Sequence, residues 1–262
     1  MNRQVLDEIT KRDYAKIQSS IESFLSQYTS KSQGFVFGLS GGIDSAVIAH
    51  ICARSFKDRT LALIMPDSRV SPKEETEDAI HLVDTLGLDY KLIDISLIHS
   101  QFANVLVPEE RALGNLRARI RASILYYYAN LKSYLVIGSS DKSEHLIGYF
   151  TKYGDGSADV CPIISLYKTQ VREFAKFLGV KQSIIEKKSS PHLWKGHVAE
   201  DEIGTNYEEI DTALYCMMDK KMSIDQTADI TGIEKNEIEK IHQMYKKNEH
   251  KRIMPPGPGE LK

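Results

Sequence analysis

The sequence lacks the features that mark membrane-spanning and secreted proteins. No apolar run in its 262 residues approaches the roughly 20 residues that a membrane-crossing helix needs. The N-terminal stretch MNRQVLDEITKRDY is charged and contains no apolar segment typical of a signal peptide. These absences predict a protein with no membrane partner and a cytoplasmic location.

Cysteine and excess positive charge are also scarce. The three cysteines, Cys52, Cys161 and Cys216, form no C-x-x-C pair, so neither a zinc site nor a redox dithiol is indicated. Lysine and arginine total 34 against 36 for aspartate and glutamate, which gives a formal net charge of -2. Because a general nucleic-acid-binding protein is usually clearly basic, this balance argues against nucleic acid as a partner.

The apolar residues, 42% of the chain, are arranged in a pattern that indicates an α/β fold. Near-helical spacing predicts an amphipathic helix over residues 5–28. Four β-like runs follow, each leading into a helical stretch: 34–39, 61–66, 91–95 and 134–138. The helix after the second run is expected to begin with Ser71 as its N-cap and Pro72 in its first turn. We therefore expect a single Rossmann-like domain with a five-stranded parallel sheet flanked by helices.

The character of the sequence changes after residue 150. A turn-rich segment and a polar loop lead to three predicted helices, over about 207–218, 223–230 and 234–247. The last residues, 252–262, are rich in proline and glycine and are expected to be mobile unless they dock on a ligand. No linker or repeat divides the chain, so residues 1–262 are expected to form one domain with a helical C-terminal part.

The stretch F-G-L-S-G-G-I-D-S-A, residues 37–46, joins the first predicted strand to its helix and indicates a phosphate site. Gly41 and Gly42 let the backbone approach a phosphate, and the start of the following helix offers free N–H groups. Ser40 and Ser45 add hydroxyl donors. The stretch has neither the lysine of a Walker A loop nor the G-x-G-x-x-G spacing of a dinucleotide-binding turn.

Asp44 is the unusual member of this loop, because a carboxylate repels phosphates unless a cation lies between them. Magnesium prefers one or two carboxylates together with phosphate oxygens. The loop therefore predicts a magnesium–polyphosphate ligand. The alternative is a tight turn in which Asp44 serves only as a helix cap.

The run S-G-G-I-D-S resembles the signature of the ATP pyrophosphatases of the adenine nucleotide alpha-hydrolase superfamily, whose members split ATP into AMP and pyrophosphate. That motif alone does not choose among the members. Nearly the whole chain, however, resembles the ammonia-dependent NAD synthetases. The segments that carry this resemblance are G-N-L-R-A-R-I-R (114–121), G-S-S-D-K-S-E (138–144), F-T-K-Y-G-D-G-S-A-D (150–159), the Lys168 region, S-P-H-L-W (190–194), D-E-I-G-x-x-Y-E-E-I-D (201–211) and His250-Lys251.

The resemblance implies roles for individual residues. Asp44 and Glu144 would hold Mg²⁺, and Asp44 and Lys168 would be catalytic. ATP, as a co-substrate, would be bound by Gly38, Leu39, Ser40, Gly41, Gly42, Ile43, Asp44, Ser45, Ser139, Lys168 and Ser190. Deamido-NAD would be contacted by Arg119, Lys152, Asp159, His250 and Lys251.

The run R-A-R-I-R allows a geometric check of one of these roles. At about 100° per residue, Arg117 and Arg121 share one face of a helix while Arg119 points nearly the opposite way. All three cannot grip one anion. The resemblance selects Arg119, which leaves Arg117 and Arg121 as predicted surface or interface charges.

The implied reaction is adenylation of the deamido-NAD carboxylate by ATP, followed by amidation with ammonia to give NAD, AMP and pyrophosphate. Glutamine-using relatives carry an added amidohydrolase domain, and too few residues precede Gly34 for one, so we expect free ammonia as the nitrogen donor. The family also implies a homodimer. Two alternatives remain at this stage: another amidating or thiolating member of the superfamily, and a non-catalytic adenine-nucleotide sensor.

Overall fold

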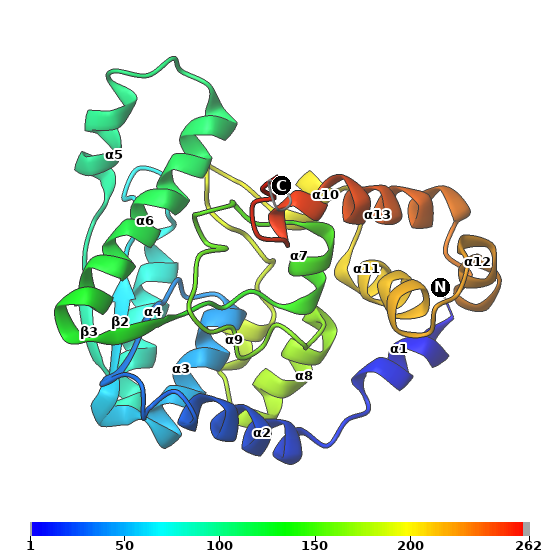
Figure 1. The fold of residues 1–262 in the computed structure, drawn as a ribbon, viewed down its shortest axis with the longest axis horizontal. Coiled ribbons are helices and arrows are strands. Elements are labelled where there is room, and N and C mark those ends of the chain that lie inside the picture. Colours follow the sequence, from blue (N-terminus) through cyan, green and yellow to red (C-terminus); the bar gives the residue numbers. More distant parts are fainter. Residues whose placement is uncertain (1, 259–262) are drawn as a thin grey trace.

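The centre of the computed structural model, which describes residues 2–258, is a parallel sheet of four strands in the order β3-β2-β1-β4 (Figure 1). The strands are β1 (Gly34–Gly38), β2 (Thr60–Ile64), β3 (Asp89–Leu92) and β4 (Tyr134–Ile137). The prediction of five strands is wrong. Beyond β4, Val160 makes only an isolated bridge to Ile137, and Pro162 two residues later has no N–H with which to extend a ladder.

Both faces of the central strands β1 and β2 are buried under helices, as their apolar sequences predict, whereas all four residues of the edge strand β3 are exposed. Phe35 and Phe37 of β1 face a core formed with α3 (Ile43–Ser55), α4 (Lys73–Leu86) and α8 (Lys168–Leu178). Val36, between them, faces the opposite core under α6 (Glu110–Lys132). Because successive side chains along a strand point to opposite faces of the sheet, the one short segment GFVFG contributes residues to both cores.

The first predicted helix is two helices rather than one. α1 (Arg3–Thr10) and α2 (Tyr14–Ser26) are separated at Lys11, where the backbone leaves helical geometry, with φ -74° and ψ 87°. Asp13 then caps α2 by accepting a hydrogen bond from the Lys16 N–H. A local capping residue therefore overrides the continuous apolar periodicity that predicted a single helix.

The expected N-cap of α4 is also wrong by one position. Pro72 is the N-cap, and the Ser71 hydroxyl instead accepts a hydrogen bond from the Asp67 N–H at 3.1 Å. Ser71 therefore closes the turn after β2 instead of starting the helix.

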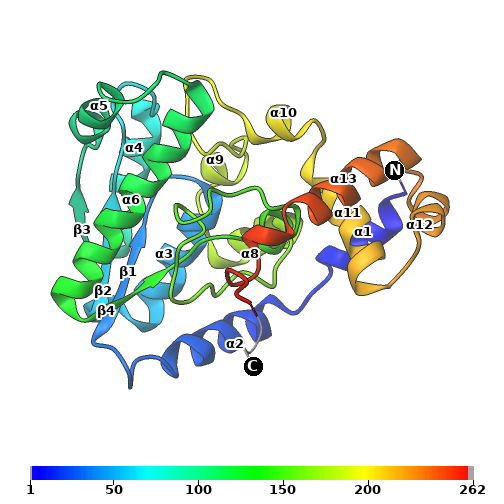
Figure 2. The same cartoon turned by 45° about the horizontal axis from the view of Figure 1, so that its top comes forward.

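The C-terminal helices form a second layer beside the sheet domain, and α1 belongs to it (Figures 1 and 2). Val5 and Ile9 of α1 pack in one core with Tyr207 and Ile238. The three helices predicted in this region are confirmed: α11 (Tyr207–Leu214) with its π-helical continuation η2 (Tyr215–Asp219), α12 (Ile224–Thr231) and α13 (Lys235–Lys247).

The remaining short elements connect these layers. They are η1 (Lys57–Arg59), α5 (Ser96–Ala103), α7 (Lys142–Ile147), α9 (Gln182–Ile185), α10 (Ala199–Ile203) and η3 (Glu249–Lys251). Among residues 2–258, no helix has the length and apolar character needed to cross a membrane. Of the predicted mobile end, Arg252 donates to the carbonyl of Leu146, whereas 259–262 lie outside the described residues.

Candidate active site

The candidate site lies where the sheet order reverses. β1 continues through α3 to its neighbour β2, whereas β4, which follows β3 in the chain, lies on the other side of β1, so the strand order reverses between β1 and β4 (Figure 2). In open α/β sheets, ligands bind at this switch point, beyond the carboxyl ends of the strands. The loop after β1 (residues 39–42) and the loop after β4 (residues 138–141) meet there.

The glycine loop after β1 is held open by its own serines. The Ser40 N–H donates to Ser45 Oγ, and that hydroxyl in turn donates to the Gly42 carbonyl at 3.0 Å. Gly41 has φ +85°, and a Cβ there would collide with the carbonyl oxygen of Glu75. Gly42 caps α3 without a side chain, so the first N–H groups of the helix face the loop unshielded.

Lys168 lies behind this loop within a ring of three carboxylates. Its Nζ atom lies 2.7 Å from Asp44 Oδ2, 2.8 Å from Asp141 Oδ2 and 2.9 Å from Glu144 Oε1. The side chains of Lys168 and Asp141 are fully buried, while those of Asp44 and Glu144 keep 21% and 20% exposure. The structure therefore brings together all three residues predicted as catalytic or metal-binding, and adds Asp141.

This cluster carries more negative than positive charge when its carboxyl groups are ionised. Burial alone would lower the pKa of Lys168, but Asp141, Asp44 and Glu144 outweigh it, and the pKa of Lys168 lies well above its ordinary value. Burial, with help from the neighbouring carboxylates, raises the pKa of Glu144 to about 8. The cluster therefore contains one fixed cation, Lys168, and an excess of negative charge that a second cation could balance.

One atom of the cluster marks where that charge would fit. Asp44 Oδ1 is shielded from solvent and has no hydrogen-bond partner within residues 2–258. In the same part of the chain, no three His, Cys, Asp or Glu side chains form a metal-binding set. A cation at Asp44 would therefore need further ligands from a bound molecule, as Mg²⁺ with phosphate oxygens has.

A cavity of about 270 Å³ opens in front of the cluster. Its floor is the glycine loop and the end of β4, and its walls come from β2, α6 and the loop 187–193. Most of the residues predicted to bind ATP line it: Gly38, Leu39, Ser40, Gly42, Ile43, Asp44, Ser139 and Ser190. The other three, Gly41, Ser45 and Lys168, are not among its lining residues.

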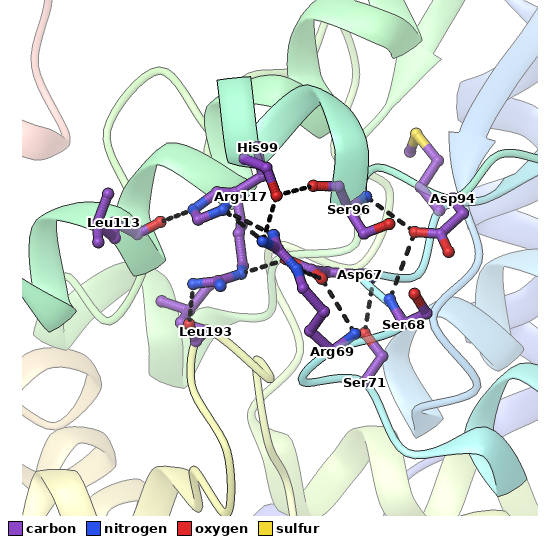
Figure 3. Close-up of polar contacts among 12 residues, drawn as sticks. Asp67, Ser68, Arg69, Ser71, Asp94, Ser96, His99, Leu113, Arg117 and Leu193 are labelled. Carbon is purple, nitrogen blue, oxygen red and sulfur yellow. Dashed lines mark hydrogen bonds and ion pairs between the residues drawn. The ribbon is translucent and has the colours of Figure 1, made fainter. Parts of the chain in front are cut away.

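The loop 187–193 is attached to the rest of the wall through Arg117. The Arg117 guanidinium donates to Asp67 Oδ2 at 2.7 Å and to the Leu193 carbonyl at 2.9 Å (Figure 3). Burial opposes the ionisation of Asp67, but hydrogen bonds from Arg69 and Arg117 hold the pKa of Asp67 well below its usual range. On the same loop, His192 Nε2 lies 2.6 Å from Glu75 Oε2 on α4.

The network around Asp67 also fixes a buried histidine (Figure 3). Arg69 donates to His99 Nδ1 at 2.9 Å, which leaves the proton of the neutral ring on Nε2, where the Leu113 carbonyl accepts it at 3.0 Å. The chain segments after β2, in α5 and at the start of α6 are therefore joined beside the cavity.

The helical wheel places Arg117 and Arg121 on one face as expected, but the prediction that these two are surface or interface charges is wrong. Arg117 is buried in the network described above, and Arg121 lines the cavity and donates to the Met65 carbonyl at 2.9 Å. Burial lowers the pKa of Arg121 to about 10. Arg119 is the exposed member, as the wheel places it on the opposite face, and it does not line the cavity.

The other residues predicted to contact deamido-NAD lie outside the cavity, in two places. Lys152 donates to the His250 carbonyl at 2.6 Å, and Lys251 donates to two carbonyls of the 148–150 segment, so these three form one group. Asp159 lies apart from them and accepts a hydrogen bond from the Val136 N–H. Their role in substrate binding remains a prediction.

Sequence reasoning missed two residues that belong to the site. Asp141 could have been identified from the sequence as the N-cap of α7, because aspartate favours that position. In the structure it accepts a hydrogen bond from the Glu144 N–H, three residues later, at 2.8 Å. Arg121 was compared with Arg119 only as a contact for deamido-NAD, and it was predicted to be a surface or interface charge. Nothing local marks either as buried, because the groups that surround them come from distant parts of the chain.

The chain has relatives along nearly its whole length. Residues 14–255 match the family model described as NAD synthase. The NH(3)-dependent NAD(+) synthetase of Hyperthermus butylicus is 46% identical over 261 residues, covering 98% of this chain and 95% of that protein.

Two solved structures share the fold. The NMN synthetase from Francisella tularensis superposes with a TM-score of 0.84 at 32% identity, covering 95% of this chain and 100% of that chain. The NH3-dependent NAD synthetase from Campylobacter jejuni has a TM-score of 0.80 at 36% identity, covering 94% of this chain and 100% of that chain.

Proposed function

Because this chain belongs to the NAD synthase family, we propose that the cluster of Lys168, Asp44 and Glu144 is the centre at which it makes NAD from deamido-NAD. The enzyme is an ammonia-dependent NAD synthetase and a ligase, with ATP as its co-substrate. One observation carries the assignment of the site: a buried lysine and two part-exposed carboxylates meet behind a glycine loop that faces a cavity.

The first half of the reaction activates a poor electrophile. A carboxylate oxygen of deamido-NAD attacks the α-phosphorus of ATP, the bond to the β-phosphate oxygen breaks, and pyrophosphate leaves. The buried ammonium group of Lys168 and the N–H groups at the start of α3 would neutralise the charge that develops on the departing phosphates. In the second half, ammonia attacks the acyl carbon, AMP leaves and the amide is formed.

Magnesium fits the donor set of this site. Asp44 and Glu144 would hold the ion, and the unpartnered Asp44 Oδ1 supports that placement. When bound, Mg²⁺ would supply positive charge beside the phosphate oxygens of ATP. The chain's own part is to hold these two carboxylates in the first turns of α3 and α7, which follow the neighbouring strands β1 and β4, and Lys168 contacts both.

Exclusion of water is the second requirement, because water competes with ammonia for the activated carboxylate. The loop 187–193 walls the cavity and is anchored by Arg117 and by the His192–Glu75 contact. It would act as a lid over bound substrates. Protection of this loop from proteolysis by ATP with deamido-NAD supports a lid, and unchanged cleavage would contradict it.

The deamido-NAD contacts are proposed to lie at a homodimer interface. Arg119 is exposed on α6, and large apolar side chains are also exposed on that helix, on α5 and on the segment between them: Leu97, Val105, Val107, Tyr127 and Leu131. Such surface is suited to burial against a second copy of the chain. Sedimentation as a monomer at micromolar concentration would contradict this arrangement. A cytoplasmic location remains our proposal.

One assay tests the function and its nearest alternatives. Protein, ATP, Mg²⁺ and ammonia are mixed with deamido-NAD, and NAD and AMP are measured. NAD and AMP formed in equal amounts are expected. AMP without NAD would favour a different amidating or thiolating enzyme, and nucleotide binding without turnover would favour a sensor.

A parallel reaction replaces deamido-NAD with the carboxylate counterpart of NMN, because one structural relative is an NMN synthetase. Faster turnover of this smaller substrate would reassign the preferred acceptor without changing the chemistry. Lys168→Met should abolish both reactions. Lys176→Met is the matched control, since Lys176 is on the same helix but half exposed, and it pairs with Glu173.

A further inference from the structure

A fully buried carboxylate, Asp211, lies behind the cluster and does not line the cavity. It belongs to α11, which packs against both α7 and α8. α7 carries Glu144, and α8 begins at Lys168. Asp211 therefore lies between the two helices whose first turns supply the proposed reacting groups.

The hydrogen bonds of Asp211 end on the first residues of those helices. Asp211 Oδ2 accepts from the Thr169 N–H at 2.8 Å, and Asp211 Oδ1 accepts from the Ser143 hydroxyl. Ser143 Oγ in turn accepts from the Lys168 N–H at 2.8 Å. The first two N–H groups of α8 are thus capped by other parts of the chain, one directly and one through Ser143.

This arrangement gives the Ser143 hydroxyl and both Asp211 oxygens hydrogen-bond partners where both residues are fully buried. Ser143 uses its single proton toward Asp211 and a lone pair toward Lys168. Burial raises the pKa of Asp211 to about 7, yet both of its oxygens act as acceptors, which fits the ionised form. A negative charge at the start of α8 is also favoured by the helix dipole.

We propose that Asp211 and Ser143 are positioning residues that set the distance between Lys168 and Glu144 by joining the first turns of α7 and α8. The inference rests on the proposed roles of Lys168 and Glu144. Ser143 adjoins Glu144, and its hydroxyl binds the backbone of Lys168, so one buried link spans both reacting side chains. Neither Asp211 nor Ser143 touches the cavity.

Single-turnover kinetics with enzyme in excess test this link, because that rate constant does not depend on the fraction of folded protein. AMP formation is followed for the wild type, Asp211→Ala, Ser143→Ala and the double variant. Each single change should lower the rate by about 10- to 100-fold, since a shift of about 1 Å at a reacting group costs that much. The KM for deamido-NAD should stay unchanged.

The double variant should be no slower than the slower single variant, because both changes break the same link. The control is Ile210→Val, which removes a methyl group from the neighbouring fully buried position on α11 and should keep the wild-type rate. Asp211→Asn retains an acceptor for the Thr169 N–H and should react faster than Asp211→Ala.

The outcomes separate two kinds of failure. No NAD from the wild type would refute the proposed function itself. An active wild type with an unchanged rate in Ser143→Ala and Asp211→Ala, or with effects that multiply in the double variant, would overturn the positioning role. If Asp211→Ala does not fold, Ser143→Ala and Asp211→Asn decide the question by the same single-turnover rate.

Discussion

Replacing Lys168 by methionine should cost far more stability than an ordinary lysine substitution. Lys168 is the shared counter-charge of Asp44, Asp141 and Glu144, all within 2.9 Å. Two of these carboxylates are about one-fifth exposed and can take up water when the lysine is gone. Asp141 is fully buried and cannot.

The magnitude follows from that buried carboxylate. Removing one partner of a buried ion pair costs about 3–5 kcal/mol, because the remaining charge stays unpaired. Total stabilities are about 5–15 kcal/mol, so Lys168→Met should be marginally folded. Urea unfolding followed by circular dichroism, at a pH near 8, measures the change through the unfolding midpoint.

A second substitution makes the test specific. Asp141→Asn in the Lys168→Met background removes the unpaired charge but keeps an oxygen for the Glu144 N–H, so most of the lost stability should return. Lys176→Met should change stability by less than about 0.5 kcal/mol. The free energy of unfolding of Lys168→Met could instead lie within about 1 kcal/mol of the wild-type value, or Asp141→Asn could restore none of the lost stability. Either result would show that Lys168 is not the counter-charge that the geometry indicates.

Three further predictions concern the walls of the site and the nitrogen donor. Gly41→Ala should lower the free energy of unfolding by at least about 1–2 kcal/mol, because the φ of Gly41 is positive and a Cβ would meet the Glu75 carbonyl. An unchanged urea unfolding midpoint would contradict this. Arg117→Met should speed proteolytic cleavage within 187–193, because the bond to the Leu193 carbonyl is lost, and equal cleavage rates would remove Arg117 as the anchor of the loop. At limiting total ammonia, turnover should rise from neutral to mildly alkaline pH, because the unprotonated base is the nucleophile; a flat profile would exclude that form.

Local pattern was a good guide to the elements of the fold. The strands β1, β2 and β4 and the three C-terminal helices follow from the pattern of apolar residues, which is a property of neighbouring residues. β3 overlaps its predicted run, 91–95, only at Lys91 and Leu92, and it is exposed. The break between α1 and α2 was missed because Asp13 caps a helix inside a continuous apolar pattern. The fifth strand was expected from the fold class alone, and no run of the sequence supplied it.

The site shows a similar division. Motif resemblance located Asp44, Glu144 and Lys168, and the structure places all three in contact. Arg117 was misjudged because its partner, Asp67, lies fifty residues earlier in the chain and is visible only after folding. The number of carboxylates around Lys168 was likewise out of reach, since it depends on how the ends of β1, β4 and α8 come together.

The pairing of α1 with the C-terminal helices has a consequence for biosynthesis. Asn2 donates to the carbonyl of Ile230, 228 residues further along the chain, and Val5 and Ile9 share a core with Ile238. At about 5–20 residues per second, the ribosome takes roughly 10–45 s to supply that partner surface. α1 therefore leaves the ribosome long before its partner helices, with its apolar face open to chaperones, and the helical layer closes only after α13 has been made.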